Sequence, residues 1–273
     1  MQSSPTVIRP GAYLVNEDTT LAKAAVARRV FGERAAFYRT SPAHTDPNVL
    51  ARLVEMASPR PEWIVLDLAT GAGHTALTLA SKVRQVIAYD LTQAMLAEAA
   101  NLIRDRSVAG IVLSRGDAHH LPFESGVFDL LTCRRAAHHF ADLPQALDEM
   151  RRVLRPGGRL VIDDRSVPKD ARVEALMNRL DTLHDPSHVW EYPAEAWKTK
   201  LAAAGFVLEQ SESYQRLRPL RDLTQGALES DAREILRLVE AMPPDIAGAF
   251  GRARVEGDWH LTHSYEMLAA VRC

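Results

Sequence analysis

Residues 63–165 alternate short apolar runs with amphipathic segments. Five of the runs are too uniformly apolar for strands with one exposed face, and they predict strands buried on both faces: WIVLDLA, QVIAYD, GIVLSRGD, VFDLLTCR and RLVIDDR. Three segments between them space their apolar residues as a helix does: HTALTLASKV, TQAMLAEAANLIRDR and DLPQALDEMRRVL. This alternation predicts a parallel sheet with helices on both faces.

The segments before and after this region follow a different pattern. Helices are predicted at residues 21–38, 47–57, 171–186 and 193–206. Strands are predicted at 206–219 and 258–273. The region between these two strands has helical character, so we expect it to lie over the sheet, with Met242, Phe250 and Trp259 in the core.

The first buried strand leads into VLDLATGAGHTALTLA, residues 65–80, where two glycines follow an aspartate. Gly71 and Gly73 lack side chains, so the backbone of this turn can approach a ligand at the carboxyl end of the strand. The same spacing also fits a tight turn that binds nothing, or a turn that binds a pyrophosphate. Asp67 favours a ligand with a cationic ammonium, because its carboxylate would repel a pyrophosphate.

Two more aspartates follow later strands. Asp90 ends the second strand, where an acid can accept hydrogen bonds from the ribose hydroxyls of a nucleotide. Asp117, in GDAHHLPF just after the third strand, can accept from an adenine amino group, or alternatively cap a turn or a helix. In series with Asp67 and the glycines, these positions predict a nucleoside-containing cofactor.

Composition limits the partners of the chain. Its 273 residues include 33 Lys and Arg against 35 Asp and Glu, a net charge of −2, so no general attraction to nucleic acid is expected. Cys133 and Cys273 lack metal-type spacing, and no metal site is predicted. Neither a membrane-spanning apolar run nor a secretory signal pattern occurs in the sequence, so we expect a cytoplasmic protein.

The chain resembles class I S-adenosylmethionine-dependent methyltransferases in the order and spacing of four motifs: VLDLATGAGHTA, VIAYD, GDAHHLPFESGVFDLLTCRRAAHHF and RVLRPGGRLVIDD. The branch it resembles is the small-molecule one that includes the ubiquinone and menaquinone C-methyltransferases. This resemblance, over residues 61–165, implies an α/β fold: a Rossmann-like, mostly parallel seven-stranded sheet of order 3-2-1-4-5-7-6, with its last strand antiparallel, helices on both faces and a small helical lid. We expect an N-terminal helical cap (1–46), a cofactor-binding core (47–165) and the remainder of the sheet with acceptor-side helical insertions (166–273).

The resemblance also implies a site for S-adenosylmethionine. Carried over by motif, the contacts are Asp67, Gly71, Ala72 and Gly73 with the methionine moiety, Asp90 with the ribose, Leu91 and Met95 near the adenine, Asp117 and Ala118 with its amine, Arg134 beside the methyl donor, and Tyr38 and His44 from a helix that closes over the cofactor.

Methyl transfer needs a base only where the acceptor must lose a proton, and histidine suits that role. AAHHF places His138 and His139 at the ligand edge of the sheet. Both are candidates for contact with the acceptor, and His139 is the candidate base because it follows the turn further toward the cleft. His184 and His188, in LHDPSHVWEY, are candidates for the acceptor side, although that segment also fits an ordinary break between two helices.

The expected activity is transfer of the methyl group of S-adenosylmethionine to a carbon or oxygen nucleophile of a small molecule, by in-line displacement, in a monomer or homodimer. The alternative from another class is a cofactor-binding sensor or partner subunit without methyl transfer, because cofactor motifs and acceptor chemistry are separable. Asp67 and the two-glycine turn disfavour an NAD-dependent oxidoreductase.

Overall fold

The computed structural model describes residues 17–273. Its strands, in chain order, are β1 (Ile64–Leu68), β2 (Gln85–Asp90), β3 (Ile111–Arg115), β4 (Phe128–Arg134), β5 (Leu154–Ser166), β6 (Phe206–Pro219), β7 (Ala253–Val255) and β8 (Asp258–Arg272). They form one sheet of order β3-β2-β1-β4-β5-β8-β6, with β7 paired to β8. The strands from β1 to β5 are parallel, and β8 is antiparallel to both β5 and β6.

The expected strand order is confirmed, with β8 in the place of the expected seventh strand. The short strand β7 is an addition that the sequence did not predict, and it pairs with the first residues of β8. Strand β5 also begins earlier than expected, at Leu154, so the RPGG sequence belongs to the strand.

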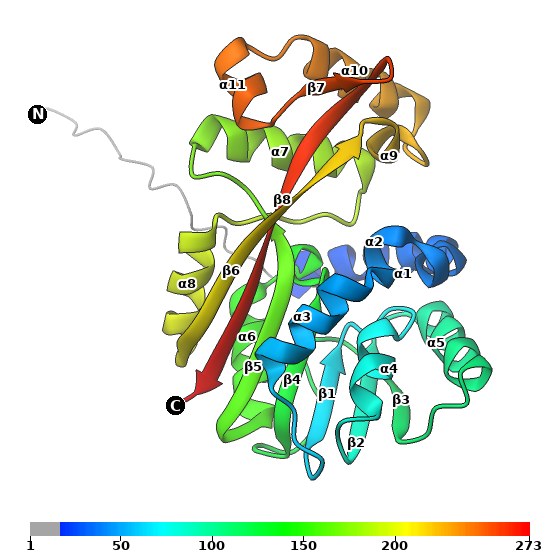
Figure 1. Cartoon of the computed structure of the whole chain (residues 1–273), viewed down its shortest axis with the longest axis vertical. Coiled ribbons are helices and arrows are strands. Elements are labelled where there is room, and N and C mark those ends of the chain that lie inside the picture. Colours follow the sequence, from blue (N-terminus) through cyan, green and yellow to red (C-terminus); the bar gives the residue numbers. More distant parts are fainter. Residues whose placement is uncertain (1–16) are drawn as a thin grey trace, which may run out of the picture.

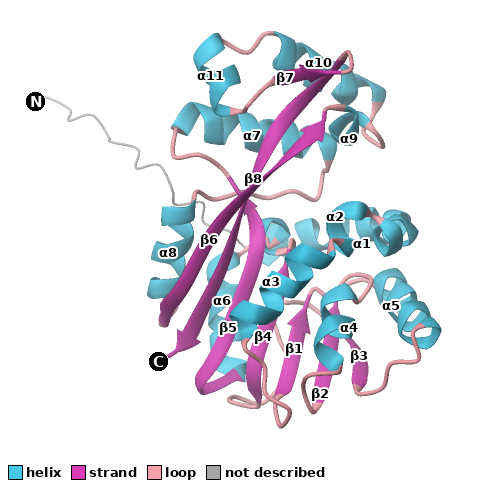
Figure 2. Ribbon diagram, viewed as in Figure 1, coloured by secondary structure: helices cyan, strands magenta, loops and turns pink. Residues whose placement is uncertain are grey.

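The helices are α1 (Glu17–Thr40), α2 (Pro42–Thr45), α3 (Pro47–Ala57), α4 (His74–Ala80), α5 (Gln93–Asp105), the 3-10 helix η1 (Ala137–His139), α6 (Leu143–Val153), α7 (Ala171–His184), α8 (Ala194–Ala203), α9 (Arg221–Thr224), α10 (Glu229–Glu240) and α11 (Pro244–Ala249). Figure 2 shows helices on both sides of the central sheet. The predicted fold class is therefore confirmed.

The central strands of the sheet carry a packed core on both faces, which explains why β1 and β4 are continuously apolar. The prediction that β3 is buried on both faces is wrong, because β3 is an edge strand of the sheet and its Val112 is 45% exposed. On β1, Val65 packs in a cluster with Leu53 of α3 and Leu79 of α4. The next residue, Leu66, points to the other face, where its cluster includes Leu147 of α6. Alternate residues of a strand point to opposite faces, so a strand covered on both sides needs apolar residues at every position.

The helical region between β6 and β8 covers only the part of the sheet where β6 and β8 extend past β5. Figure 1 shows α9, α10 and α11 grouped with α7 around these extended ends of β6 and β8. These helices share an apolar cluster of their own, which includes Met177 and Ile235, and in which Met242 and Phe250 are buried. Leu261 of β8 belongs to the same cluster and Trp259 packs against it half-buried, so these helices bury their apolar faces between α7 and the extended end of the sheet.

Helices α1 and α2 lie across the end of the sheet at which β1 ends (Figure 1). Helix α1 also packs against α5. Residues 1–16 of the expected N-terminal cap lie outside the described residues, so only residues 17–46 of that cap can be placed.

Candidate active site

The turn between β1 and α4 owes its shape to two glycines with different surroundings. Gly71 has φ +55°, and apart from its two chain neighbours no atom of the described residues would lie within 4 Å of a Cβ built on it. Gly73 has φ +86°, and a Cβ there would lie 3.1 Å from the Cβ of Ala99 on α5. Gly71 therefore leaves open space beside the turn, whereas Gly73 lets α4 begin close to α5.

The carboxylate of Asp67 is buried at the end of β1, and two hydroxyl groups hold it. Thr132 Oγ1 donates to Asp67 Oδ1 at 2.7 Å, and Thr70 Oγ1 donates to Oδ2 at 2.5 Å. Burial raises the pKa of Asp67, and these two hydrogen bonds oppose the rise. Each carboxylate oxygen can accept a second hydrogen bond, so Asp67 can still bind a cationic donor.

Asp90, at the end of β2, fixes the position of the glycine turn. Its Oδ2 accepts the backbone N–H of Gly71, and its Oδ1 accepts the backbone N–H of Thr92, both at 2.8 Å. Burial raises the pKa of Asp90 to about 6. The negative charge at pH 7 is therefore held in a largely desolvated place, where a hydroxyl donor from a ligand would be favourable.

Asp117 lies just after β3, next to His119. Both the backbone N–H and the ring Nδ1 of His119 approach Asp117 Oδ1, at 2.9 and 2.5 Å. Burial disfavours the charged carboxylate, but the bonds from His119 outweigh it and lower the pKa of Asp117. Among the described residues both contacts use Oδ1, which leaves Oδ2 to accept from a ligand.

Arg134, the last residue of β4, carries a buried donor that finds no acceptor in the described part of the chain. Its Nε donates to Thr75 Oγ1 at 3.0 Å, and Nη2 donates to the carbonyl oxygen of His44 at 2.8 Å. The third nitrogen, Nη1, is buried and has no hydrogen-bond partner among residues 17–273. A buried donor of a charged group is costly to leave unpaired, so an anionic ligand group is expected there.

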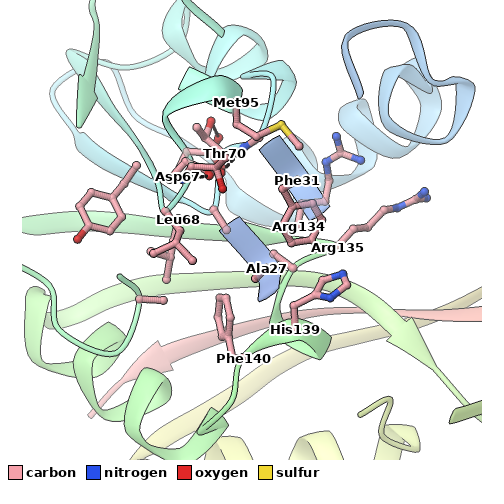
Figure 3. Close-up of a pocket in the computed structure, with 18 of the residues that line it drawn as sticks. Ala27, Phe31, Asp67, Leu68, Thr70, Met95, Arg134, Arg135, His139 and Phe140 are labelled. Carbon is pink, nitrogen blue, oxygen red and sulfur yellow. Dashed lines mark hydrogen bonds between the residues drawn. The ribbon is translucent and has the colours of Figure 1, made fainter. Parts of the chain in front are cut away.

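These groups surround one cavity of about 1030 Å³, a volume that includes the open space at its mouth. Ten of the expected cofactor contacts line it: Tyr38, Asp67, Gly71, Ala72, Asp90, Leu91, Met95, Asp117, Ala118 and Arg134. His44 lines it as well. In Figure 3, Asp67 and Thr70 lie toward one side of the view and His139 and Phe140 toward another, with Ala27 of α1 between them. Gly73 is not part of the lining that the described residues form.

The two adjacent histidines of η1 differ in their surroundings. The His138 ring is buried, and its Nδ1 lies 2.5 Å from Asp164 Oδ1. It is not among the described residues that line the cavity. The His139 ring lines the cavity, in edge contact with Phe31 at 4.9 Å between ring centres. Burial and the neighbouring His138 lower the pKa of His139 to about 4, so this ring is neutral at pH 7.

His184 and His188 lie elsewhere. His184 Nδ1 is 2.8 Å from the carbonyl oxygen of Leu223, in a separate pocket between α1 and the end of β6. His188 is buried and bonded through Nε2 to Asn178 Oδ1 at 2.8 Å. Neither ring lines the cavity that residues 17–273 form around Asp67. The structure therefore does not bring these two rings into the cavity around Asp67, and their contact with an acceptor stays a prediction.

A protein-family model described as "Methyltransferase domain" matches residues 66–162. YcgJ of Bacillus subtilis, an uncharacterized methyltransferase, is 36% identical over 173 residues, which cover 63% of this chain and 68% of that protein. The demethylmenaquinone methyltransferase of Thermus thermophilus is 35% identical over 175 residues, which cover 57% of this chain and 79% of that protein. The chain belongs to the class I S-adenosylmethionine-dependent methyltransferases.

The crystal structure of YcgJ aligns with this methyltransferase at a TM-score of 0.79 and 27% identity, over 82% of this chain and 98% of that one. The likeness therefore extends beyond the matched domain to most of the sheet and its helices. Within the described part of the methyltransferase, no helix has both the length and the apolar character needed to cross a membrane.

Sequence reasoning missed several residues of this site. Ala24, Ala27 and Phe31 of α1 line the cavity, and the sequence indicated only that they lie in a helix. Ala69 has φ +54°, an unusual conformation for a residue with a side chain, and sequence alone does not reveal it. Ser187 contacts His139 across 48 positions of sequence, a pairing that depends on tertiary structure.

Proposed function

We propose that this methyltransferase binds S-adenosylmethionine in the cavity at the carboxyl ends of β1, β2 and β4, and transfers its methyl group to a carbon or oxygen nucleophile of a small molecule. One observation supports this most strongly. Carboxylates at or just after the ends of three strands, Asp67, Asp90 and Asp117, line one cavity together with the open face of Gly71.

The unpaired donors and acceptors suit the amino-acid end of the cofactor. A methionine moiety carries one carboxylate and one ammonium. Arg134 Nη1 is a buried donor of the cavity lining that has no acceptor among residues 17–273, and we assign it to the carboxylate. Asp67 retains acceptor capacity beside the turn, and we assign it to the ammonium. Gly71 gives the backbone room to approach, and Ala72 continues that wall of the cavity.

The nucleoside end fits the residues that follow β2 and β3. We assign the ribose hydroxyls to Asp90, whose two oxygens each hold one backbone N–H and can each accept another hydrogen bond. Leu91 and Met95 offer apolar surface for the adenine ring, and Asp117 Oδ2 with Ala118 lies at the edge where its amine would bind. Residues 47–165 would then bind the cofactor.

The remaining segments would close and complete the site. S-adenosylmethionine supplies a methyl carbon already activated by a sulfonium sulfur. The protein therefore needs mainly to position the acceptor and exclude water. Helix α1 covers the cavity with Ala24, Ala27 and Phe31, and Tyr38 extends the cover in ring contact with His44 at 4.7 Å. Residues 17–46 serve as the cap, and residues 166–273 complete the sheet and carry acceptor-side insertions.

Calorimetric titration of the full chain with S-adenosylmethionine, S-adenosylhomocysteine and NAD tests the proposal. We expect both sulfur compounds to bind at one site per chain, and NAD not to bind. Binding of NAD alone would replace the proposal with a dehydrogenase function. Absence of binding by either sulfur compound would refute it.

The acceptor is tested separately. The Thermus relative is a demethylmenaquinone methyltransferase, so a demethylated menaquinone is the first small-molecule acceptor to assay. Production of S-adenosylhomocysteine that depends on an added acceptor would support an enzyme. Tight cofactor binding without turnover on any of a broad set of phenols, quinols and activated carbon acids would favour a sensor or partner subunit instead.

A further inference from the structure

A short hydrogen-bond chain runs from the cavity into the protein behind His139. The ring Nδ1 of His139 lies 3.1 Å from Ser187 Oγ. Ser187 Oγ in turn donates to Asp185 Oδ1 at 2.5 Å, and the backbone N–H of Ser187 donates to the same oxygen at 2.8 Å. Ser187 and Asp185 are both buried.

The backbone holds this segment against η1. The N–H groups of Val189 and Trp190 both donate to the carbonyl oxygen of His138, at 2.9 and 3.1 Å. Arg34 of α1 adds an ion pair with Asp185, at 3.6 Å between Nη1 and Oδ2. Ser187 is thus held beside His139 by contacts that do not involve the imidazole.

The hydrogen bonds from Asp185 through Ser187 determine which nitrogen of His139 carries the proton. A serine hydroxyl has one hydrogen, and Ser187 gives it to Asp185. Burial alone would raise the pKa of Asp185, but His139, Ser187 and Arg34 outweigh it and lower that pKa, so Asp185 is an ionised acceptor. Ser187 Oγ can then only accept from His139, which requires a hydrogen on Nδ1. The lone pair of the neutral ring is left on Nε2.

The groups around His139 favour this neutral form. The centre of the His138 ring, also on η1, lies 4.0 Å from the centre of the His139 ring. The centre of the His188 ring, from the segment that carries Ser187, lies 6.4 Å from it. Phe31 covers one edge from α1. Two carboxylates oppose the neutral form: Asp185 and, from β5, Asp164, which is already bonded to His138.

We propose that Ser187 and Asp185 are positioning residues that hold His139 as the Nδ1–H tautomer, so that Nε2 serves as the general base for an acceptor that must lose a proton. This inference rests on the proposed function. The cavity wall beside His139 includes Phe31, Phe140 and Ala141, so the acceptor class is a flat apolar molecule with a phenolic or enolic O–H, or a carbon acid of similar acidity.

Methyl transfer with His139 as the base needs no reactant besides S-adenosylmethionine and the acceptor. The acceptor proton passes to His139 Nε2, the electron pair it leaves forms the bond to the methyl carbon, and the pair of the broken carbon–sulfur bond stays on sulfur as a neutral thioether. His139 becomes an imidazolium, which the negative charge of Asp185 stabilises through Ser187.

Nitrogen-15 NMR of the full chain labelled at histidine tests the tautomer directly. We expect a protonated Nδ1 and an unprotonated Nε2 for His139 at pH 7.5, with the signals identified by their loss in His139→Gln. Ser187→Ala should shift these signals toward the Nε2–H form, and Ser187→Thr, which keeps a hydroxyl, should restore them. Nε2–H in the unaltered protein, or no change in Ser187→Ala, would overturn the inference.

A pair of probes tests the acceptor class in the presence of S-adenosylhomocysteine. Phenol should shift the Nε2 resonance by donating a hydrogen bond, whereas anisole, which has no O–H, should not. No Nε2 shift with phenol at millimolar concentration, or equal shifts with both, would overturn the assigned class. Titration of S-adenosylhomocysteine on the same samples separates this result from the proposed function, since failure to bind it refutes only the latter.

Discussion

Replacement of Asp90 by asparagine tests the assigned ribose site with little change in shape. In the wild type, the two carboxylate oxygens accept from the N–H groups of Gly71 and Thr92. An asparagine has one amide oxygen, so one of these buried donors loses its acceptor, at a cost of about 1–3 kcal/mol in stability. Removing a buried charge offsets that loss, because burial has raised the pKa of Asp90 to about 6. We therefore expect the protein to remain folded.

Cofactor affinity should fall far more clearly. A hydrogen bond to a charged acceptor is worth about 1 kcal/mol more than one to a neutral acceptor. Two ribose hydroxyls on Asp90 would lose about 2 kcal/mol together, which corresponds to a roughly 30-fold weaker Kd. Calorimetric titration with S-adenosylhomocysteine at pH 7.5 measures this, and thermal unfolding of the same samples checks that the variant is folded.

A matched control comes from α7. Asp170 also accepts from two backbone N–H groups, those of Arg172 and Val173, but it caps a helix and lies outside the cavity lining. Asp170→Asn keeps a good capping residue, so its S-adenosylhomocysteine affinity should match the wild type. If folded Asp90→Asn binds within about twofold of wild type, the ribose is not at Asp90 and the reasoning fails.

Three further predictions concern Ala69, Gly73 and Asp90. Ala69→Gly should stabilise the protein by about 1 kcal/mol, because Ala69 has φ +54°, and an unchanged melting temperature would contradict this. Gly73→Ala should destabilise by about 1–3 kcal/mol, since its Cβ would lie 3.1 Å from that of Ala99. Gly257 has φ +89°, but among the described residues no atom beyond its chain neighbours would lie within 4 Å of a Cβ on it. Gly257→Ala should therefore lower the free energy of unfolding by less than Gly73→Ala when both are measured by urea unfolding, and equal losses would exclude the steric explanation. Finally, the pKa of Asp90 is about 6 in the folded protein, against 3.8 for an ordinary aspartate. The proton bound to folded Asp90 therefore stabilises the protein at low pH, and the free energy of unfolding should fall by about 3 kcal/mol as pH rises through about 6. Urea unfolding between pH 4 and pH 7.5 should show this decline relative to Asp90→Asn, and parallel pH profiles would contradict it.

The sequence predicted many of the residues that line the cavity around Asp67, because those residues are defined by local pattern. Asp67, Asp90 and Asp117 each lie at or just after the end of an apolar run, and parallel strands bring such ends to one edge of a sheet. The histidines proposed for the acceptor side are less well grouped. Four histidines were candidates, and only His139 lines the cavity within the described chain. Adjacent residues in a short turn point in different directions, and sequence does not give those directions.

The order of apolar and polar residues by itself determined the parallel strands, the helices between them and the turn that follows β1, because these features depend on neighbours a few positions apart. Only the tertiary structure decided that Gly71 faces the cavity while Gly73 faces Ala99, and that the helices after β6 pack on α7. It also decided that Ser187 and Asp185 stand behind His139. Each of these depends on contacts between segments distant in sequence, whose partners are chosen by packing and by the pairing of buried polar groups.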